Sequence, residues 1–258
     1  MAEQYRIGLI VPSSNTTMET EIPAMLARRV AEHDGQRFTF HSSRVRLQQV
    51  TAEALAAMVD GSERCVVELA DAHVDVMAYA CLVAVMAQGS NYHEQIEPRL
   101  AAVAAASGPS VPVISSAGAL VRGLQALRVS RVAIVAPYLA RLTELVVNYL
   151  RDAGIEVVDS VSLEIPDNIA VGQVDPLRLP EIAERLDLSG AECLVLSACV
   201  QMPSLPAIEA AEQRFGLPVV SASVATTYEI LARLDLDPVV PGAGRLLAGQ
   251  LPVAAAPL

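Results

Sequence analysis

Apolar runs recur along the first half of the chain, and segments with helical periodicity separate them. Continuous Val, Ile and Leu runs between amphipathic helices are typical of parallel strands buried on both faces of a sheet. The alternating run "RFTFHSS" (37–43) predicts a further strand nearer an edge. Three buried strands are predicted, at "RIGLIV" (6–11), "VDVMAYA" (74–80) and "VPVISS" (111–116).

Two of the intervening helices are predicted from their periodicity and capping residues. The segment 14–32 follows the first strand, and the segment 51–72 precedes the strand at 74. Thr51 can cap the second segment, whose apolar residues fall on one helical face. These apolar residues are Leu55, Met58, Val59, Val66 and Leu69. The pattern therefore predicts an α/β unit with a parallel sheet.

The strand pattern of the first half returns in the second half in the same order. Three ordered matches, at offsets of 125, 118 and 106 residues, indicate a duplicated α/β unit. The matched segments are 6–12 with 131–137, 74–81 with 191–199, and 111–118 with 217–224.

We therefore predict two pseudo-symmetric α/β lobes, each a parallel sheet flanked by helices, with the active site in the cleft between them. The helix expected over residues 224–236 returns to the first lobe. The predicted first lobe thus comprises residues 1–118 and 223–258, and the second comprises residues 119–222.

Two of the four cysteines, Cys81 and Cys199, follow matching strands of the two lobes. Ligands of open α/β sheets bind beyond the carboxyl ends of the strands, so both thiols are expected to flank one cleft. The alternative interpretation is that each thiol is a small buried hydrophobe. We keep that interpretation for Cys65, which lies within a predicted helix, and for Cys193, which lies within a predicted strand.

Charge and composition argue against several classes of function. A net charge of −11 and an aromatic content of 3% without tryptophan argue against nucleic-acid binding. The chain lacks a basic amino-terminal region and any apolar stretch of about 20 residues, so we expect no targeting segment and no membrane contact. A cytoplasmic protein with reduced thiols is expected. The four histidines lack metal-ligand spacing, and no phosphate-binding glycine motif occurs, so we predict neither metal nor nucleotide.

Three segments resemble a known family. They are "GLIVPSSNTTMETEIP" (8–23), "YACLVA" (79–84) and "LSACVQMPS" (196–204), and together they resemble the maleate cis-trans isomerases of the aspartate/glutamate racemase superfamily. The resemblance covers nearly the whole chain up to the tail "PVAAAPL". It implies conversion of the small dicarboxylate maleate to fumarate without a cofactor, a homodimer, and a place in nicotinate degradation.

The resemblance also implies roles for five residues. Cys81 corresponds to the nucleophile, and Cys199 either transfers a proton or positions the substrate. Asn15, Tyr138 and Asn168 correspond to polar residues that hold the substrate. Without the family, Asn15 could equally cap a helix, Asn168 could form a turn, and Tyr138 could pack with its hydroxyl in water.

The chemistry of maleate explains why a thiol is needed. Addition of a thiolate to one alkene carbon makes the central bond single, so that rotation and expulsion of the thiolate give fumarate. A helix beginning directly after Cys81 is expected to favour the thiolate. The three motifs contain no Arg or Lys, which predicts that backbone N–H groups receive the carboxylates. These N–H groups belong to Leu82, Val83, Val200 and Gln201.

Other functions of the same cleft stay open at this point. Racemases of the superfamily follow the first cysteine with Asn-Thr, whereas Leu82 and Val83 follow it here. Arylmalonate decarboxylases keep only the second cysteine, whereas this chain has both. A racemase, a decarboxylase or a non-catalytic dicarboxylate sensor are therefore the alternatives to an isomerase.

Overall fold

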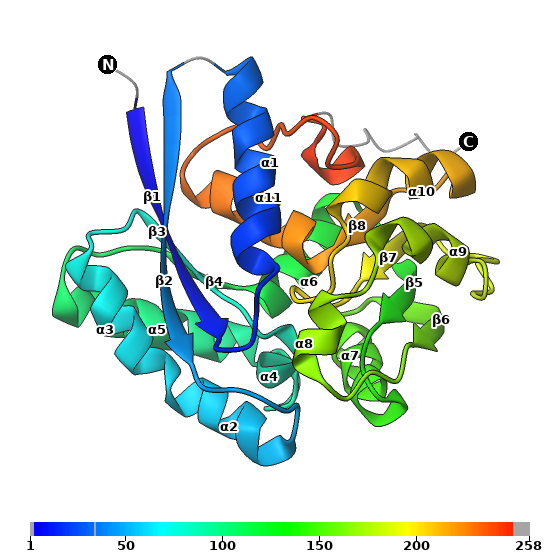
Figure 1. Ribbon diagram of the computed structural model, residues 1–258, viewed down its shortest axis with the longest axis horizontal. Helices are drawn as coiled ribbons and strands as arrows, with labels where there is room; N and C mark the ends of the chain where they lie inside the picture. Colours follow the sequence, from blue (N-terminus) through cyan, green and yellow to red (C-terminus); the bar gives the residue numbers. More distant parts are fainter. Residues whose placement is uncertain (1–2, 34, 250–258) are drawn as a thin grey trace.

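The protein folds around two parallel four-stranded sheets, as a computed structural model that describes residues 3–33 and 35–249 shows. The strand orders are β2-β1-β3-β4 and β6-β5-β7-β8, so the second sheet repeats the topology of the first. The two sheets occupy the left and right halves of Figure 1. The strands are β1 (Glu3–Pro12), β2 (Gln36–Val45), β3 (Val76–Tyr79), β4 (Val113–Ser115), β5 (Arg131–Ala136), β6 (Glu156–Ser162), β7 (Cys193–Ser197) and β8 (Val219–Ser221).

The duplication extends to strand register. Ile7 pairs with Val76 in the first sheet, and Val132 pairs with Cys193 at the matching position of the second. In both sheets a carboxylate just before the third strand accepts the backbone N–H of the arginine that precedes this pair. The predicted fold class of two α/β lobes is confirmed, and the strand over 37–43 lies at an edge as expected.

Helices cover the faces of both sheets, which buries the apolar strands predicted from sequence. In the first half they are α1 (Met18–Glu32), α2 (Ala52–Asp60), α3 (Ser62–Asp71), α4 (Leu82–Met86), α5 (His93–Ser107) and α6 (Ser116–Ala126). In the second half they are α7 (Ala140–Asp152), α8 (Asn168–Gly172), α9 (Leu179–Ala183), α10 (Ile208–Phe215) and α11 (Ala222–Arg233). Three short 3₁₀ turns are η1 (Pro176–Arg178), η2 (Leu205–Ala207) and η3 (Arg245–Leu247).

The segment 51–72 forms two helices, so the prediction of one continuous helix is wrong. Thr51 caps α2 as expected, its hydroxyl accepting the Ala54 N–H at 3.2 Å. The chain then breaks at Gly61, where an added Cβ would lie 2.7 Å from the Val45 side chain. The close approach of the helix junction to β2 therefore requires glycine, a tertiary constraint that helical periodicity does not contain.

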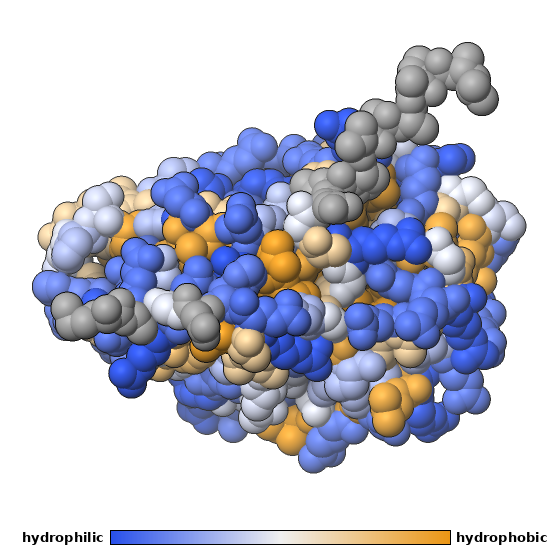
Figure 2. All heavy atoms as spheres, turned by 90° about the horizontal axis from the view of Figure 1, so that it is seen from above, coloured by the Kyte–Doolittle hydropathy of each residue, from blue (hydrophilic) through white to orange (hydrophobic). Residues whose placement is uncertain are grey.

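The last long helix, α11, returns to the first sheet. Ser221 caps it by accepting the Val224 N–H at 3.2 Å. It packs against β3 and β4 and lies beside α1 and α6 (Figure 1). Within the described residues, no helix combines the length and the apolarity needed to cross a bilayer. On the face seen in Figure 2, hydrophilic side chains surround small groups of apolar ones.

Candidate active site

All nine predicted site residues line one small cavity between the two sheets. Its volume is about 20 Å³. Both lobes contribute residues to the lining of this cavity. The Cys81 and Cys199 thiols therefore lie at one cavity, as expected. The lining residues are Pro12, Asn15, Leu47, Val50, Cys81, Leu82, Val83, Tyr138, Asn168, Cys199, Val200 and Gln201.

Cys81 lies at the carboxyl end of β3, where the chain turns abruptly into α4. The Ala80 N–H donates to the Ile10 carbonyl at 2.8 Å, which ties this end of β3 to β1. Cys81 itself has φ +83° and ψ +67°, a left-handed conformation that non-glycine residues rarely adopt. Such strain is characteristic of functional positions, and here it places the thiol at the cavity, 9% exposed.

Burial dominates the protonation of Cys81. The pKa of the thiol is raised to about 12, chiefly by removal from water and to a smaller extent by the nearby Cys199. The Ala84 N–H in the first turn of α4 lowers this pKa. The predicted helix start after Cys81 is thus present, but burial has the larger effect on the pKa of this thiol.

Cys199 has more hydrogen-bond donors around it than Cys81. Burial raises its pKa, whereas the Tyr138 hydroxyl and the N–H groups of Gln201 and Met202 lower it. The Gln201 N–H lies 3.4 Å from the Cys199 Sγ atom. The Ser197 hydroxyl donates to the Cys199 carbonyl at 2.8 Å and fixes the turn after β7. Cys199 is therefore the better placed of the two thiols to carry negative charge.

The two site asparagines each make structural hydrogen bonds as well as lining the cavity. The Asn15 Oδ1 atom accepts the N–H groups of Thr17 and Met18 at 3.1 and 3.0 Å, so Asn15 supports the start of α1, where Thr17 is the N-cap residue. Asn168 begins α8, and its Nδ2 donates to the Ser14 hydroxyl at 2.7 Å. These hydrogen bonds are compatible with substrate contact, because they use only part of each amide.

The Gln201 N–H points to the Cys199 thiol, whereas the sequence predicts that it receives a substrate carboxylate. The side chain of Gln201 instead bridges the lobes through Thr16, Ser14 and Asn168. Leu82, Val83 and Val200 line the cavity. That their N–H groups receive a substrate carboxylate stays a prediction.

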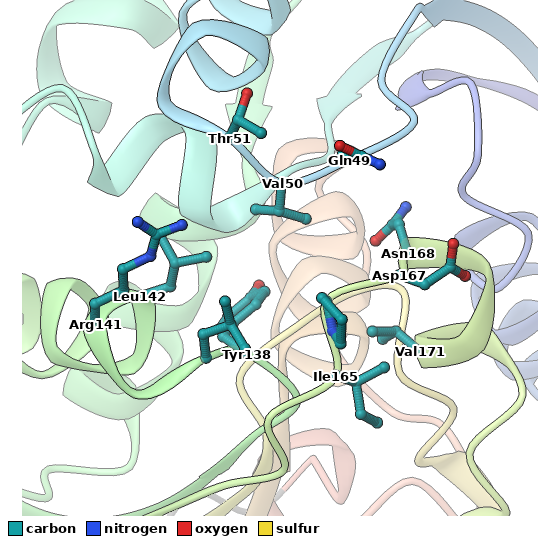
Figure 3. A pocket seen from close by; sticks show the side chains of 12 residues that line it. Gln49, Val50, Thr51, Tyr138, Arg141, Leu142, Ile165, Asp167, Asn168 and Val171 are labelled. Atoms are coloured by element: carbon teal, nitrogen blue, oxygen red, sulfur yellow. The ribbon is translucent and has the colours of Figure 1, made fainter.

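A larger outer cavity of about 260 Å³ adjoins the inner one and shares Val50, Tyr138 and Asn168 with it. Arg141 and Asp167 lie on opposite sides of it, and Val50 lies between them (Figure 3). The outer cavity therefore lies next to the cavity that contains the thiols, with Val50 at the boundary of both.

Sequence reasoning missed Leu47 and Val50, which cover the inner cavity from the β2–α2 connection. The Leu47 N–H donates to the Ser13 hydroxyl at 3.0 Å. Arg44 was missed too; it donates to the carbonyl groups of Ser13 and Asn15 at 3.2 and 2.9 Å. The sequence indicates these residues only by their position, because the segment that contains them follows the carboxyl end of a predicted strand.

The other two cysteines are completely buried, in α3 and β7. Burial raises the pKa of both thiols, which agrees with the packed interpretation of Cys65 and Cys193. All four cysteines are unpaired. Within residues 3–33 and 35–249, no group of three His, Cys, Asp or Glu side chains is arranged to hold a metal ion.

Fold and site together define a two-lobed α/β enzyme with one thiol from each lobe in a shared cavity. The profile of the arylmalonate decarboxylase family matches residues 7–247. The maleate isomerase of Geobacillus stearothermophilus is 57% identical over 97% of this chain and 100% of its own length. The chain belongs to the arylmalonate decarboxylase family and, within it, to the maleate isomerases, as the sequence motifs predict.

Two solved structures extend the likeness to the fold. A maleate isomerase variant from Pseudomonas putida S16 with maleate has a TM-score of 0.94 and 52% identity, covering 96% of this chain and 98% of that one. A cysteine-to-serine variant of the Nocardia farcinica maleate cis-trans isomerase with a covalent succinylcysteine intermediate has a TM-score of 0.91 and 50% identity. It covers 96% of this chain and 100% of its own.

Proposed function

We propose that this protein isomerises maleate to fumarate through a covalent adduct on Cys81. The observation that carries the proposal is the convergence of Cys81 and Cys199, from matching strands, on one cavity with a neutral lining. The isomerase activity predicted from sequence agrees with the relatives at more than half identity. The succinylcysteine in the Nocardia farcinica protein is formed on a cysteine other than the one replaced by serine, which supports separate tasks for two thiols.

The two thiols divide the chemistry. The Cys81 sulfur adds to one alkene carbon, and the alkene electron pair moves towards the adjacent carboxylate. A succinyl group is saturated, so the other carbon must gain a proton, and Cys199 is the group placed to give it. After rotation about the central single bond, Cys199 takes a proton back and the sulfur–carbon bond breaks. Burial holds the pKa of the Cys81 thiol high, so its proton must be removed first. Cys199, reacting from its thiolate form, is the base placed to take that proton, and the same proton is then available for the other carbon.

Neutral donors hold the substrate dianion. The amides of Asn15 and Asn168, the Tyr138 hydroxyl and the N–H groups of Leu82 and Val83 surround the thiols. Preorganised donors of this kind stabilise charge that develops on a carboxylate by several kcal/mol each. They must outweigh the net charge of −11, which disfavours a dianion.

The inner cavity must widen when substrate binds. A volume of about 20 Å³ holds roughly one water molecule, whereas maleate has eight non-hydrogen atoms. Val50, Tyr138 and Asn168 line both this cavity and the outer one, so movement of Val50 would connect the two. Return of the Val50 side chain would exclude water from the adduct.

Proton NMR tests the proposal directly. The protein is incubated with maleate, and the vinyl resonances are followed. The proposal predicts a fumarate singlet that Cys81→Ala abolishes, and retention of most activity by that variant would contradict the role of Cys81. Binding of maleate without product would instead support a dicarboxylate sensor. Turnover of an amino acid or an arylmalonate, but not of maleate, would support a racemase or a decarboxylase.

We also propose a homodimer in the cytoplasm that takes part in nicotinate degradation, without nucleic-acid or membrane partners. The family resemblance and the net charge support this assignment. The proposed lobe division, 1–118 with 223–258 and 119–222, is supported by the two sheets and by the packing of α11 on β3 and β4. Residues 250–258 of that division lie outside the described part of the chain. Light scattering during size-exclusion chromatography tests the dimer.

A further inference from the structure

The Gln201 side chain occupies the junction between the two lobes, beside the inner cavity. It is 2% exposed. Its Oε1 accepts the Thr16 N–H at 2.9 Å, and its Nε2 donates to the carbonyls of Ser14 and Asn168 at 3.1 and 2.8 Å. The amide thus uses both of its donors and one acceptor position to join the loop before α1 to the start of α8.

The backbone of Gln201 extends the same junction. Its carbonyl accepts the Thr17 hydroxyl at 2.7 Å, and its N–H lies 3.4 Å from the Cys199 sulfur. One residue therefore contacts the segment that carries Asn15, the residue Asn168, and the thiol of Cys199.

The residues around the Gln201 amide leave room for it but for little else. Gly172, in the last turn of α8, lies so close that an added Cβ would be 2.6 Å from the Gln201 Nε2 and 3.1 Å from the Thr16 Oγ1. Helix α8 can approach the junction this closely only because position 172 has no side chain. The fit would be lost with a bulkier residue at either position.

We infer that Gln201 is a positioning residue that fixes Asn15, Asn168 and Cys199 relative to one another across the two lobes. This inference rests on the proposed isomerase function of the same cavity. It assigns to the Gln201 amide a task different from substrate contact. Because small displacements of reacting groups cost about 10²-fold in rate, loss of the amide is expected to lower turnover far more than it weakens substrate binding.

Two substitutions test the inference. Gln201→Met keeps the length of the side chain but removes every amide hydrogen bond. We expect kcat to fall roughly 10- to 100-fold with KM changed by less than about threefold. The midpoint pH for alkylation of Cys199 by iodoacetamide, followed by peptide mass spectrometry, should rise, because the Gln201 N–H no longer faces the sulfur squarely. Wild-type kcat or a wild-type alkylation midpoint would overturn the inference.

Gln201→Glu provides a second test that holds if the methionine variant does not fold. A protonated glutamic acid has one O–H donor and one acceptor, so it replaces the amide in part, whereas the carboxylate cannot donate to two carbonyls. The ratio of variant to wild-type kcat should therefore rise as pH falls. A ratio independent of pH would contradict the positioning role.

A matched control separates this role from the general loss of an interlobe contact. The Tyr149 hydroxyl in α7 accepts the His93 N–H of α5 at 3.0 Å, remote from the inner cavity lining. Tyr149→Phe should lower stability but leave kcat and Cys199 alkylation unchanged. If wild-type protein fails to convert maleate, the proposed function fails, whereas the alkylation midpoints still decide the role of Gln201.

Discussion

At the scale of single residues, the two thiols differ in the hydrogen-bond donors that lower their pKa values. Cys81 is held in a strained conformation with the Ala84 N–H as its one favourable donor, whereas three donors oppose the effect of burial at Cys199. The sequence identified both cysteines because each follows a matching strand. Their unequal surroundings depend on Tyr138 and on the turn after Cys199, contacts that a strand pattern does not encode.

Tyr138→Phe tests the contribution of one donor. Its hydroxyl lies 3.2 Å from the Ala198 carbonyl and also interacts with the Cys199 thiol, lowering the pKa of Cys199. Without the hydroxyl this pKa should rise, so the pH profile of Cys199 alkylation should move to higher pH, and kcat should fall about tenfold or more. Tyr228→Phe in α11 is the control and should change neither the alkylation profile nor kcat. If the pH profile of Cys199 alkylation does not move in Tyr138→Phe, the Tyr138 hydroxyl does not lower the pKa of Cys199.

At the scale of secondary-structure elements, the sequence predicted the apolar strands better than their connections. Strands β1, β3 and β4 fall within one to three residues of the runs that predicted them. The edge strand β6 was not predicted, since its solvent-facing residues weaken the apolar signal. The break at Gly61 and the placement of Leu47 and Val50 over the cavity arise from contacts distant in sequence. Local periodicity cannot supply such contacts.

Helix α1 and the segment after Cys199 are joined by a buried carboxylate. Glu21 is 6% exposed, and its Oε1 accepts the N–H groups of Ser204 and Leu205 at 2.5 and 2.6 Å. Its Oε2 accepts the hydroxyl groups of Ser204 and Ser223. Glu21 thereby holds the far end of the loop that begins at Cys199.

Glu21→Gln should destabilise the protein by about 2 kcal/mol, because an amide leaves part of these buried donors unsatisfied. Urea denaturation measures the change. Glu19→Gln removes a more exposed ion pair with Arg44 and should cost at most about 1 kcal/mol. Equal losses of unfolding free energy in the two variants would contradict the stabilising role of the buried Glu21 carboxylate.

At the scale of the whole molecule, several contacts join the lobes, and two of them involve the site or its control. The motif segments around Asn15 and Cys199 meet at the active site, and α5 meets α7 through His93 and Tyr149. Duplication explains why two lobes exist and why each supplies one cysteine. It does not explain the junction at Gln201, because the offset of 118 residues that matches Cys199 with Cys81 matches Gln201 with Val83, whose side chain has no hydrogen-bonding group.

The His93 junction should weaken in acid. Burial and Arg122 lower the pKa of His93 below its ordinary value, while Glu97 and Glu94 raise it. An unfolded histidine titrates near pH 6.5, so the unfolded chain gains a proton first, and stability present above that pH is lost as pH falls towards the folded pKa. His93→Gln should flatten the decline in stability between pH 7 and 5 by at most about 1.4 kcal/mol per pH unit. Parallel wild-type and variant curves would contradict this.

The central claim, that Cys81 forms a covalent bond with maleate, is tested most directly by mass spectrometry of protein trapped with substrate. Acid quenching during turnover, followed by proteolysis, should yield a Cys81 peptide heavier by one substrate mass. Cys199→Ser should slow both formation and release of the adduct, so turnover should fall sharply and the adduct that does form should remain on the Cys81 peptide. An adduct confined to the Cys199 peptide, or turnover with no adduct in either protein, would contradict the account.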